Sequence, residues 1–434
     1  YGGTPAAISQ GNLLDVASIL FTALFNATNQ VGLSAKATVI FSLSLSVVAS
    51  YILARQFLSS PESCAMFCVG YGFSAYVCND IFWGHPASTL AVGILPLTLW
   101  AWERNFKISY QGTKTVVVAA AFLFLLFISE WYICFYALVF LALRFLHRSL
   151  KASSCKERRL LMIRSAFAFI MFALLAAPIL IPFLVLYKVP SSFEETLGFG
   201  ARPEFYAYRS LTPIGTPVRY QYIGATVVFL ALAPLILEKD FAPPAEKSRN
   251  LPSFSQDYSF FLALTAFFVL YSAGQNGVVP VSHFVLLIFP IAAIFRFLGK
   301  SSIIATVCIS LCASFGLHMA LFAFLRGNSI HALSRKTLRK AIVALTLILA
   351  FLDLTQGLSP TVIAPFRPTN CHEFIKMRKG DFRVVEASGR DWAWGTSNFV
   401  SAYVGHDIAG QSPIGIRKYP DRSATWLKLY ELSL

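Results

Sequence analysis

The segment Ser282–Lys300, SHFVLLIFPIAAIFRFLGK, is an apolar run that carries Arg296 and Lys300 near its end, just before another long apolar span. The distribution of charge described below places both cations on the non-cytoplasmic side of the membrane. Cations are scarce on that side, and charged groups placed there usually have a role. A guanidinium at the membrane surface can bind two phosphate oxygens of an anionic headgroup at once. The alternative is that Arg296 is an interfacial residue that extends its charged end to water. The rest of the chain bears on this choice.

The composition predicts a polytopic membrane protein. Of 434 residues, 56% are hydrophobic and 15% aromatic, and the mean hydropathy is +0.63. The formal net charge is +15, but the cations are scattered between apolar spans. Membrane topology and lipid phosphates therefore explain the charge better than nucleic acid, which is not expected as a partner. The cysteine pairs Cys64/Cys68 and Cys308/Cys312 have i,i+4 spacing within apolar runs, which is typical of helix packing rather than a metal site.

We predict an all-α membrane domain with about ten spans, since a spanning helix needs about 20 mainly apolar residues. The predicted spans are 36–55, 62–82, 87–103, 114–129, 131–146, 165–188, 220–238, 257–274, 301–325 and 341–358. Residues 11–31 are also apolar but contain Asp15, Asn26, Asn29 and Gln30. We predict an interfacial or re-entrant helix there.

Basic residues divide unequally between the two sides of this topology. Successive spans cross the membrane in alternating directions, which places four loops on the same side as Arg55. These loops are 104–114, 147–164, 239–256 and 326–340. Together with Arg55 and Arg144 they hold 19 Lys and Arg residues, whereas the opposite side holds seven before the tail. The richer side is cytoplasmic by the positive-inside rule. Residues 1–35 and the tail are therefore predicted to be external.

Two domains are predicted, a multi-spanning domain at 1–358 and a small extracytoplasmic domain at 359–434. An external amino terminus needs a cleaved signal or a preceding helix, and we expect a first helix with its loop upstream of Tyr1. The tail is polar, with the strand-like pieces FRVVEA and SAYVGHDI between turn residues. It predicts a small α/β or β-rich domain outside the plasma membrane.

The external loop 189–219 is long for a membrane connector, and loops of this length are often functional. Three of its cations join the two of the opening segment in a set suited to a phosphate or pyrophosphate headgroup. These predicted lipid-phosphate ligands are Arg202, Arg209, Arg219, Arg296 and Lys300. Glu194 and Glu195 of the same loop are candidate substrate-binding residues. The alternative is a solvated loop in which the acidic and basic side chains pair with one another.

Four further polar residues fall on the external side of the predicted topology. Asp80 and His85, in CNDIFWGHP, are suited to binding sugar hydroxyls, a metal or a proton. The alternative is that they cap a helix and line a turn. Asp15 and Glu130, the latter in a tight turn between two spans, join Asp80 as candidate catalytic bases.

Several segments resemble the YfhO-like branch of the GT-C glycosyltransferases. They are YILARQFL (51–58) followed by an Ala-rich span, FWGHP (82–86), ILPLTLW (94–100) and FPIAAIFRFLGKSS (289–302), with a small external domain after the last span. The resemblance covers most of the chain through diffuse, hydrophobic motifs. It implies a multi-pass transferase of the cell envelope that takes a sugar from a polyprenyl-phosphate donor on the extracytoplasmic side. The hallmark carboxylates of that family lie in its first external loop, so the main base is expected upstream of Tyr1, or the chain is an inactive homologue.

The resemblance implies a direct transfer. An external carboxylate takes the proton of an acceptor hydroxyl, which attacks the anomeric carbon as polyprenyl phosphate leaves. Arg296 and one loop arginine are expected to stabilise the charge on the leaving phosphate. The expected partners are membrane lipid, the polyprenyl-phosphate sugar, and a glycan, lipid or protein acceptor. No cofactor is assigned, and a divalent cation such as Mg²⁺ or Mn²⁺ is left open.

Two other classes of function stay open. A transporter or lipid flippase would use the same outward cations and should carry ionisable groups or broken helices at mid-membrane. Only His318 and Asp353 lie within predicted spans in this way, and we expect structural hydrogen bonding for both. A scaffold or assembly subunit would use the spans to anchor the tail domain and would need no catalytic chemistry.

Overall fold

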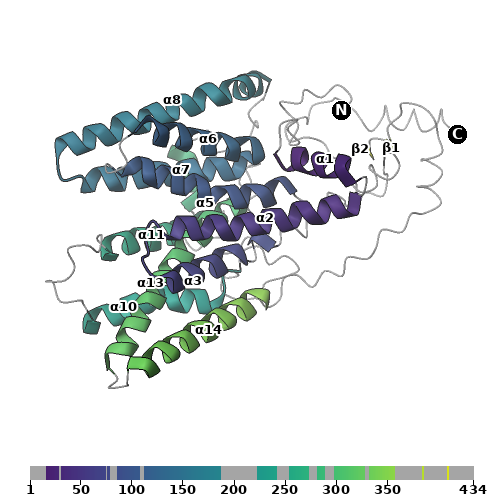
Figure 1. The fold of residues 1–434 in the computed structure, drawn as a ribbon. Coiled ribbons are helices and arrows are strands. Elements are labelled where there is room, and N and C mark those ends of the chain that lie inside the picture. The colour runs from purple at the N-terminus through teal and green to yellow at the C-terminus, as the bar shows by residue number, and fades with distance from the viewer. Residues whose placement is uncertain are drawn as a thin grey trace. The chain divides into compact units, whose positions relative to one another are not determined.

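In the computed structural model, the regular elements of the described residues are helices and one pair of two-residue strands (Figure 1). It describes residues 16–28, 31–74, 76–78, 86–107, 112–186, 222–241, 254–272, 281–288, 298–327, 332–356, 384–385 and 408–409. The helices are α1 Val16–Thr28, α2 Val31–Ala54, α3 Pro61–Gly72, α5 Pro86–Phe106, α6 Thr113–Ser129, α7 Trp131–Lys151, α8 Cys155–Leu186, α10 Ala225–Phe241, α11 Phe254–Ser272, α12 Val281–Ile288, the 3-10 helix η6 Leu298–Ser301, α13 Ser302–Gly327 and α14 Ala332–Gln356. Each of the ten predicted spans overlaps one of these helices.

Four of the described helical segments are long and apolar enough to cross a membrane. They are Lys36–Ala54, Trp131–Lys151, Cys155–Ile181 and Leu298–Ala323. Three shorter apolar segments accompany them, at Thr113–Ser129, Ala225–Leu237 and Asp257–Ser272. These lengths and compositions indicate a membrane protein, as the sequence predicts.

α13 is the centre of the bundle. About 83% of the apolar stretch within Leu298–Ala323, which comprises η6 and most of α13, is buried. The corresponding share in the other three candidate spans is 33–39%. α13 packs against α10, α11 and α3. A Cβ added to Gly316 of α13 would lie 1.7 Å from the Leu230 carbonyl oxygen of α10, so only glycine allows this backbone approach. That carbonyl lies four residues before Pro234, which has no N–H to donate to it.

α2 packs on α5 and α3 through a row of small hydroxyl residues. The buried members of this row recur every four residues, at Ser34, Thr38, Ser42, Ser46 and Ser50. Several donate to the carbonyl one turn earlier, as Thr38 does to Ser34 at 2.8 Å. Small residues let membrane helices approach closely, because lipid supplies no hydrophobic drive for their association.

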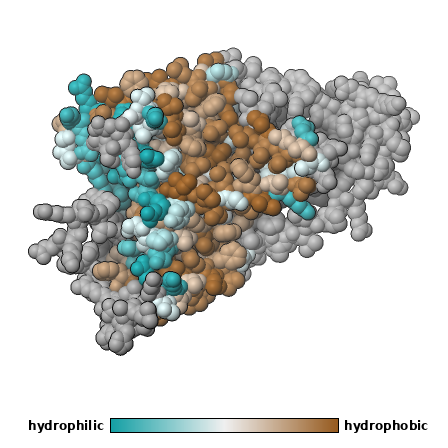
Figure 2. Space-filling model, viewed as in Figure 1, coloured by the Kyte–Doolittle hydropathy of each residue, from teal (hydrophilic) through white to brown (hydrophobic). Residues whose placement is uncertain are grey.

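The face of the bundle in Figure 2 is largely apolar. It shows a broad hydrophobic area bordered on one side by a hydrophilic strip, which runs downward from the junction of α7 and α8. Large exposed side chains include Phe41, Phe167, Leu174, Phe229 and Leu349, which come from four different helices. A surface of this kind is expected to face lipid rather than water.

Several described helices extend past the predicted spans into the loops between them, and α8 and α14 do so furthest. α8 begins at Cys155 inside the predicted loop 147–164, and α14 begins at Ala332 inside 326–340. Ser154 caps the start of α8, since its hydroxyl accepts the Glu157 N–H at 3.1 Å, and the Glu157 carboxylate accepts the Ser153 N–H at 2.9 Å. Charged residues such as those that follow Cys155 mark the end of the apolar run, but they do not end the helix.

The chain forms two compact units. One comprises 14–176 and 191–362, and the other 1–13, 177–190 and 363–434. In the second unit, β1 Val384–Val385 pairs in parallel with β2 Ile408–Ala409. β1 lies within the predicted strand-like piece FRVVEA, and β2 begins at the last residue of SAYVGHDI. The rest of the tail lies outside the described residues, so its fold stays a prediction.

Candidate functional site

Two of the sequence-predicted site residues, Glu130 and Lys300, belong to the described part of the chain, and they form an ion pair. The Lys300 Nζ lies 3.2 Å from Glu130 Oε1. The other candidates fall outside the described residues and stay predictions: Asp15, Asp80, His85, Glu194, Glu195, Arg202, Arg209, Arg219 and Arg296. The prediction that Glu130 lies in a tight turn is confirmed, since α6 ends at Ser129 and α7 begins at Trp131.

The ion pair is part of a polar cluster, here called the Lys300 cluster, of Ser88, Glu130, Tyr132 and Lys300. The Ser88 hydroxyl donates to Glu130 Oε2 at 2.8 Å. The Lys300 ammonium donates to the Ser88 oxygen at 3.2 Å and lies 5.3 Å from the centre of the Tyr132 ring. The carboxylate is thus held by a hydroxyl and an ammonium, one on each oxygen.

Three separate elements position this cluster. Ser88 lies in the first turn of α5, Lys300 in the 3-10 helix η6 just before α13, and Glu130 in the single-residue break between α6 and α7. Glu130 has an extended backbone, with φ −158° and ψ 109°, and its side chain does not cap the following helix. Its carboxylate reaches Ser88 on α5 instead.

The Lys300 cluster is only partly buried. The Lys300 side chain is 25% exposed and that of Glu130 is 14% exposed, while Ser88 is buried. A partly exposed ammonium can bind an anion, and the carboxylate beside it can accept a proton from a hydroxyl group.

A second polar cluster, the Arg144 network, lies at the other end of the bundle. Arg144 Nε bonds Glu103 Oε1 at 2.5 Å, and Arg144 Nη1 bonds Asp257 Oδ1 at 2.8 Å. Arg148 Nη2 lies 3.1 Å from Glu103 Oε2. Ser88 and Glu103 are 15 residues apart on α5, which places the two clusters about 22 Å apart along that helix.

The Arg144 network is closed from solvent. Arg144 is 0% exposed, Glu103 2% and Asp257 9%. The Arg144 guanidinium also lies over the rings of Phe260 and Phe261, at 5.2 and 5.1 Å from their centres. Two carboxylates face two guanidinium groups, so the charges balance within the protein.

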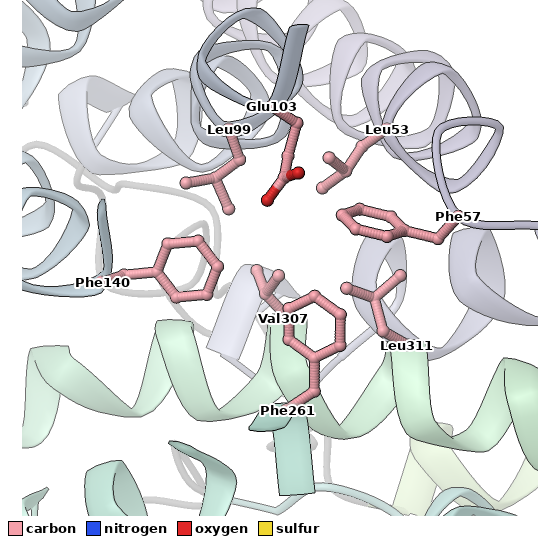
Figure 3. A pocket seen from close by; sticks show the side chains of 8 residues that line it. All are labelled: Leu53, Phe57, Leu99, Glu103, Phe140, Phe261, Val307 and Leu311. Atoms are coloured by element: carbon pink, nitrogen blue, oxygen red, sulfur yellow. The ribbon is translucent and has the colours of Figure 1, made fainter. Parts of the chain in front are cut away.

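Apolar side chains from five helical regions surround the Glu103 carboxylate, which points into the space between them (Figure 3). They are Leu53, Phe57, Leu99, Phe140, Phe261, Val307 and Leu311. This space has no room for a water molecule. The network is thus built to hold charges in a dry interior, not to admit a ligand.

Sequence reasoning missed the Arg144 network. It treated Arg144 only as a cation that determines topology, and it assigned no role to Glu103 or Asp257. A signal was present, because single charges close to the ends of apolar helices are costly unless they are paired. Just outside α5, Lys107 donates to the Gln56 side chain at 3.1 Å, and burial lowers the pKa of this lysine.

Asp353 has the structural role that the sequence predicts. Its Oδ2 accepts the Thr226 N–H at 2.6 Å, and its Oδ1 accepts the Tyr222 hydroxyl. The carboxylate of α14 therefore caps the N-terminus of α10, where unpaired N–H groups attract negative charge.

Within the described ranges, no group of three or more His, Cys, Asp or Glu side chains is arranged to hold a metal ion. Comparison with protein-family models and with curated proteins found no match for this chain. The geometry of the two polar clusters is therefore the basis for a functional proposal.

Proposed function

We propose that this chain is a membrane glycosyltransferase that moves a sugar from a polyprenyl-phosphate donor to an acceptor hydroxyl at the Lys300 end of the bundle. The observation that carries the proposal is the ion pair between Glu130 and Lys300. The sequence selects one of them as a base and the other as a phosphate ligand, from segments far apart in the chain. Their meeting at 3.2 Å, beside the Ser88 hydroxyl, supports a shared site.

In the proposed reaction, Glu130 takes the proton of the acceptor hydroxyl as its oxygen attacks the anomeric carbon. The bond between the anomeric carbon and the phosphate oxygen breaks, and polyprenyl phosphate leaves with the bonding electron pair. Lys300 stabilises the negative charge that grows on the departing phosphate. Arg296, four residues before Lys300 in the sequence, stays a sequence-based candidate for the same role.

The proposed orientation places the Lys300 end outside the cytoplasm. Its support is the unequal distribution of cations, because the end near the Arg144 network also carries Arg55, Arg158, Arg159 and Lys340. A donor whose sugar is already linked to a lipid phosphate needs no cytoplasmic nucleotide. This is consistent with an external reaction centre.

One observation favours the transporter or flippase alternative. It is the presence of charged groups buried between α5, α7 and α11. These groups lie near helix ends, in a space that excludes water, and each carboxylate is paired. An ion pathway would need an opening to solvent. The enzyme proposal is therefore favoured, and the scaffold alternative is left to the experiment.

The test is turnover of a short-chain prenyl-phosphoryl hexose by the purified protein in nanodiscs supplemented with membrane extract as acceptor source. We expect release of prenyl phosphate by the wild type and a loss of about 100-fold or more in Glu130→Gln, which keeps the shape of the side chain but removes the base. Glu62→Gln, a partly exposed carboxylate paired with Arg339, is the matched control and should retain activity. Equal turnover by wild type and Glu130→Gln would contradict the proposal.

A further inference from the structure

The Glu130 carboxylate already occupies the donors that a phosphate group would use. Its Oε1 lies 3.2 Å from the Lys300 ammonium, and its Oε2 accepts the Ser88 hydroxyl at 2.8 Å. The two donors are themselves 3.2 Å apart, so they converge on one small volume. A terminal phosphate presents several acceptor oxygens and fits the same pair of donors.

A carboxylate and a phosphate cannot share these donors. Both are anions, and like charges a few ångströms apart repel strongly when water is partly excluded. A phosphate that binds Lys300 and Ser88 must therefore move the Glu130 carboxylate away. The position of Glu130 allows this, because it lies in the break between α6 and α7, its side chain does not cap α7, and it is 14% exposed.

We infer that Glu130 acts as an internal anion that occupies the phosphate subsite of Ser88 and Lys300, and that a phosphate monoester or diester group displaces it on binding. This inference rests on the proposed function and adds Ser88 to it as a phosphate-binding residue. Displacement releases the carboxylate from the Ser88 hydroxyl and the Lys300 ammonium. The base thus becomes free to take a proton only when the phosphate of the donor is in place.

The Arg144 network shows what a permanent ion pair looks like in the same protein. There each carboxylate is buried, and Glu103 receives two guanidinium groups. Glu130 and Lys300 are 14% and 25% exposed and are joined by single contacts. Exchange with a ligand is therefore favoured at the Lys300 cluster.

The test measures binding of farnesyl phosphate to the full chain in nanodiscs of zwitterionic lipid. Glu130→Gln removes the competing charge and should tighten binding by about tenfold, since loss of one charge-assisted contact to the donors is worth about that factor. Glu130→Asp, which keeps the charge but is one methylene shorter, should tighten it less. Lys300→Met and Ser88→Ala should weaken binding, and Glu62→Gln should leave it unchanged.

The outcomes separate this inference from the proposed function. Tighter binding in Glu130→Gln with weaker binding in Lys300→Met supports the exchange. Binding that requires Lys300 but is unchanged or weaker in both Glu130 variants overturns the exchange and leaves the phosphate site in place. No binding by the folded wild type, or binding indifferent to Lys300, overturns both. Thermal unfolding of each variant shows that it is folded, and Glu130→Asp decides the question if Glu130→Gln does not fold.

Discussion

The two polar clusters at the ends of α5 consist of similar residues but differ in their exposure to solvent. The Arg144 network has side chains 0–9% exposed at its centre, balanced charges and no space for water. The Lys300 cluster pairs one ammonium with one carboxylate, at 25% and 14% exposure. The first arrangement ties α5, α7 and α11 together, and the second leaves charged groups within reach of a ligand.

This difference separates stability from function. Removing one partner of a buried ion pair leaves an uncompensated charge in a dry interior, which is strongly destabilising. Removing one partner of a partly exposed pair costs little, because water replaces it. We therefore expect substitutions in the Arg144 network to act on folding and substitutions in the Lys300 cluster to act on substrate.

The largest expected effect is a difference in chemical labelling, because we propose that the two clusters face opposite sides of the membrane. Cys155, at the start of α8, is exposed near the Arg144 network. In a Cys371→Ser background, a membrane-impermeant maleimide should label Cys155 only after the cells are permeabilised.

Lys36→Cys supplies the matched control for the labelling. Lys36 is exposed near the start of α2, toward the opposite end of the bundle. With Cys155 and Cys371 replaced by Ser, this variant should be labelled in intact cells. Labelling of Cys155 in intact cells would reverse the proposed orientation.

Arg144→Met should lower the free energy of unfolding by about 3–5 kcal/mol, because Glu103 and Asp257 are left buried without their shared partner. Chemical unfolding in detergent measures the loss. Arg148→Met is the control, since Arg148 is 25% exposed and makes one contact to Glu103. Its expected cost is about 1 kcal/mol.

The triple variant Glu103→Leu, Arg144→Met and Asp257→Leu sharpens the same test. Replacing a complete buried charge set by apolar residues is often neutral or stabilising. We expect this variant to regain most of the stability that Arg144→Met loses. A triple variant that is folded and stable but has lost turnover would show that the network has a functional role as well.

Lys300→Met should lower turnover of the prenyl-phosphoryl sugar by about 100-fold, since removal of one preorganised donor from a developing anion typically costs that much. Its free energy of unfolding should fall by no more than about 1 kcal/mol, because the pair is partly exposed. Turnover and unfolding are measured on the same preparation. A stability loss as large as that of Arg144→Met would remove the contrast between the clusters.

The smallest effect is expected at the pair of Arg339 and Glu62, which lies 3.1 Å apart with side chains 39% and 26% exposed. Arg339→Met should change the free energy of unfolding by less than about 1 kcal/mol and leave turnover unchanged. A cost of several kcal/mol, measured by chemical unfolding, would show that exposure is not what separates the clusters.

Features that depend on a continuous run of residues were predictable from the sequence. α2, α6 and α7 follow single apolar runs, and Glu130 marks the sharp break between the last two. The starts of α8 and α14 lie outside the apolar runs, among charged residues that resemble a loop, although the N-cap at Ser154 supports a helix. The end of an apolar run is set by the membrane, while the end of a helix is set by its caps.

Tertiary pairing could not be predicted in the same way. Arg144 bonds residues 41 and 113 positions away, and Lys300 bonds Ser88 at a separation of 212. The sequence identified Glu130 and Lys300 as candidates from residue type and topology, but it gave no reason to join them or to include Ser88. Such contacts follow from how α5, α7 and α13 pack, which local patterns do not encode.

The most direct test of the account is a density map of the protein in nanodiscs with bound farnesyl phosphate. We predict phosphate density within hydrogen-bonding distance of Lys300 Nζ and Ser88 Oγ, with the Glu130 carboxylate moved off both groups and the Arg144 network unchanged. Phosphate density near the Arg144 network, or an empty Lys300 cluster with Glu130 still in place at saturating ligand, would contradict the account.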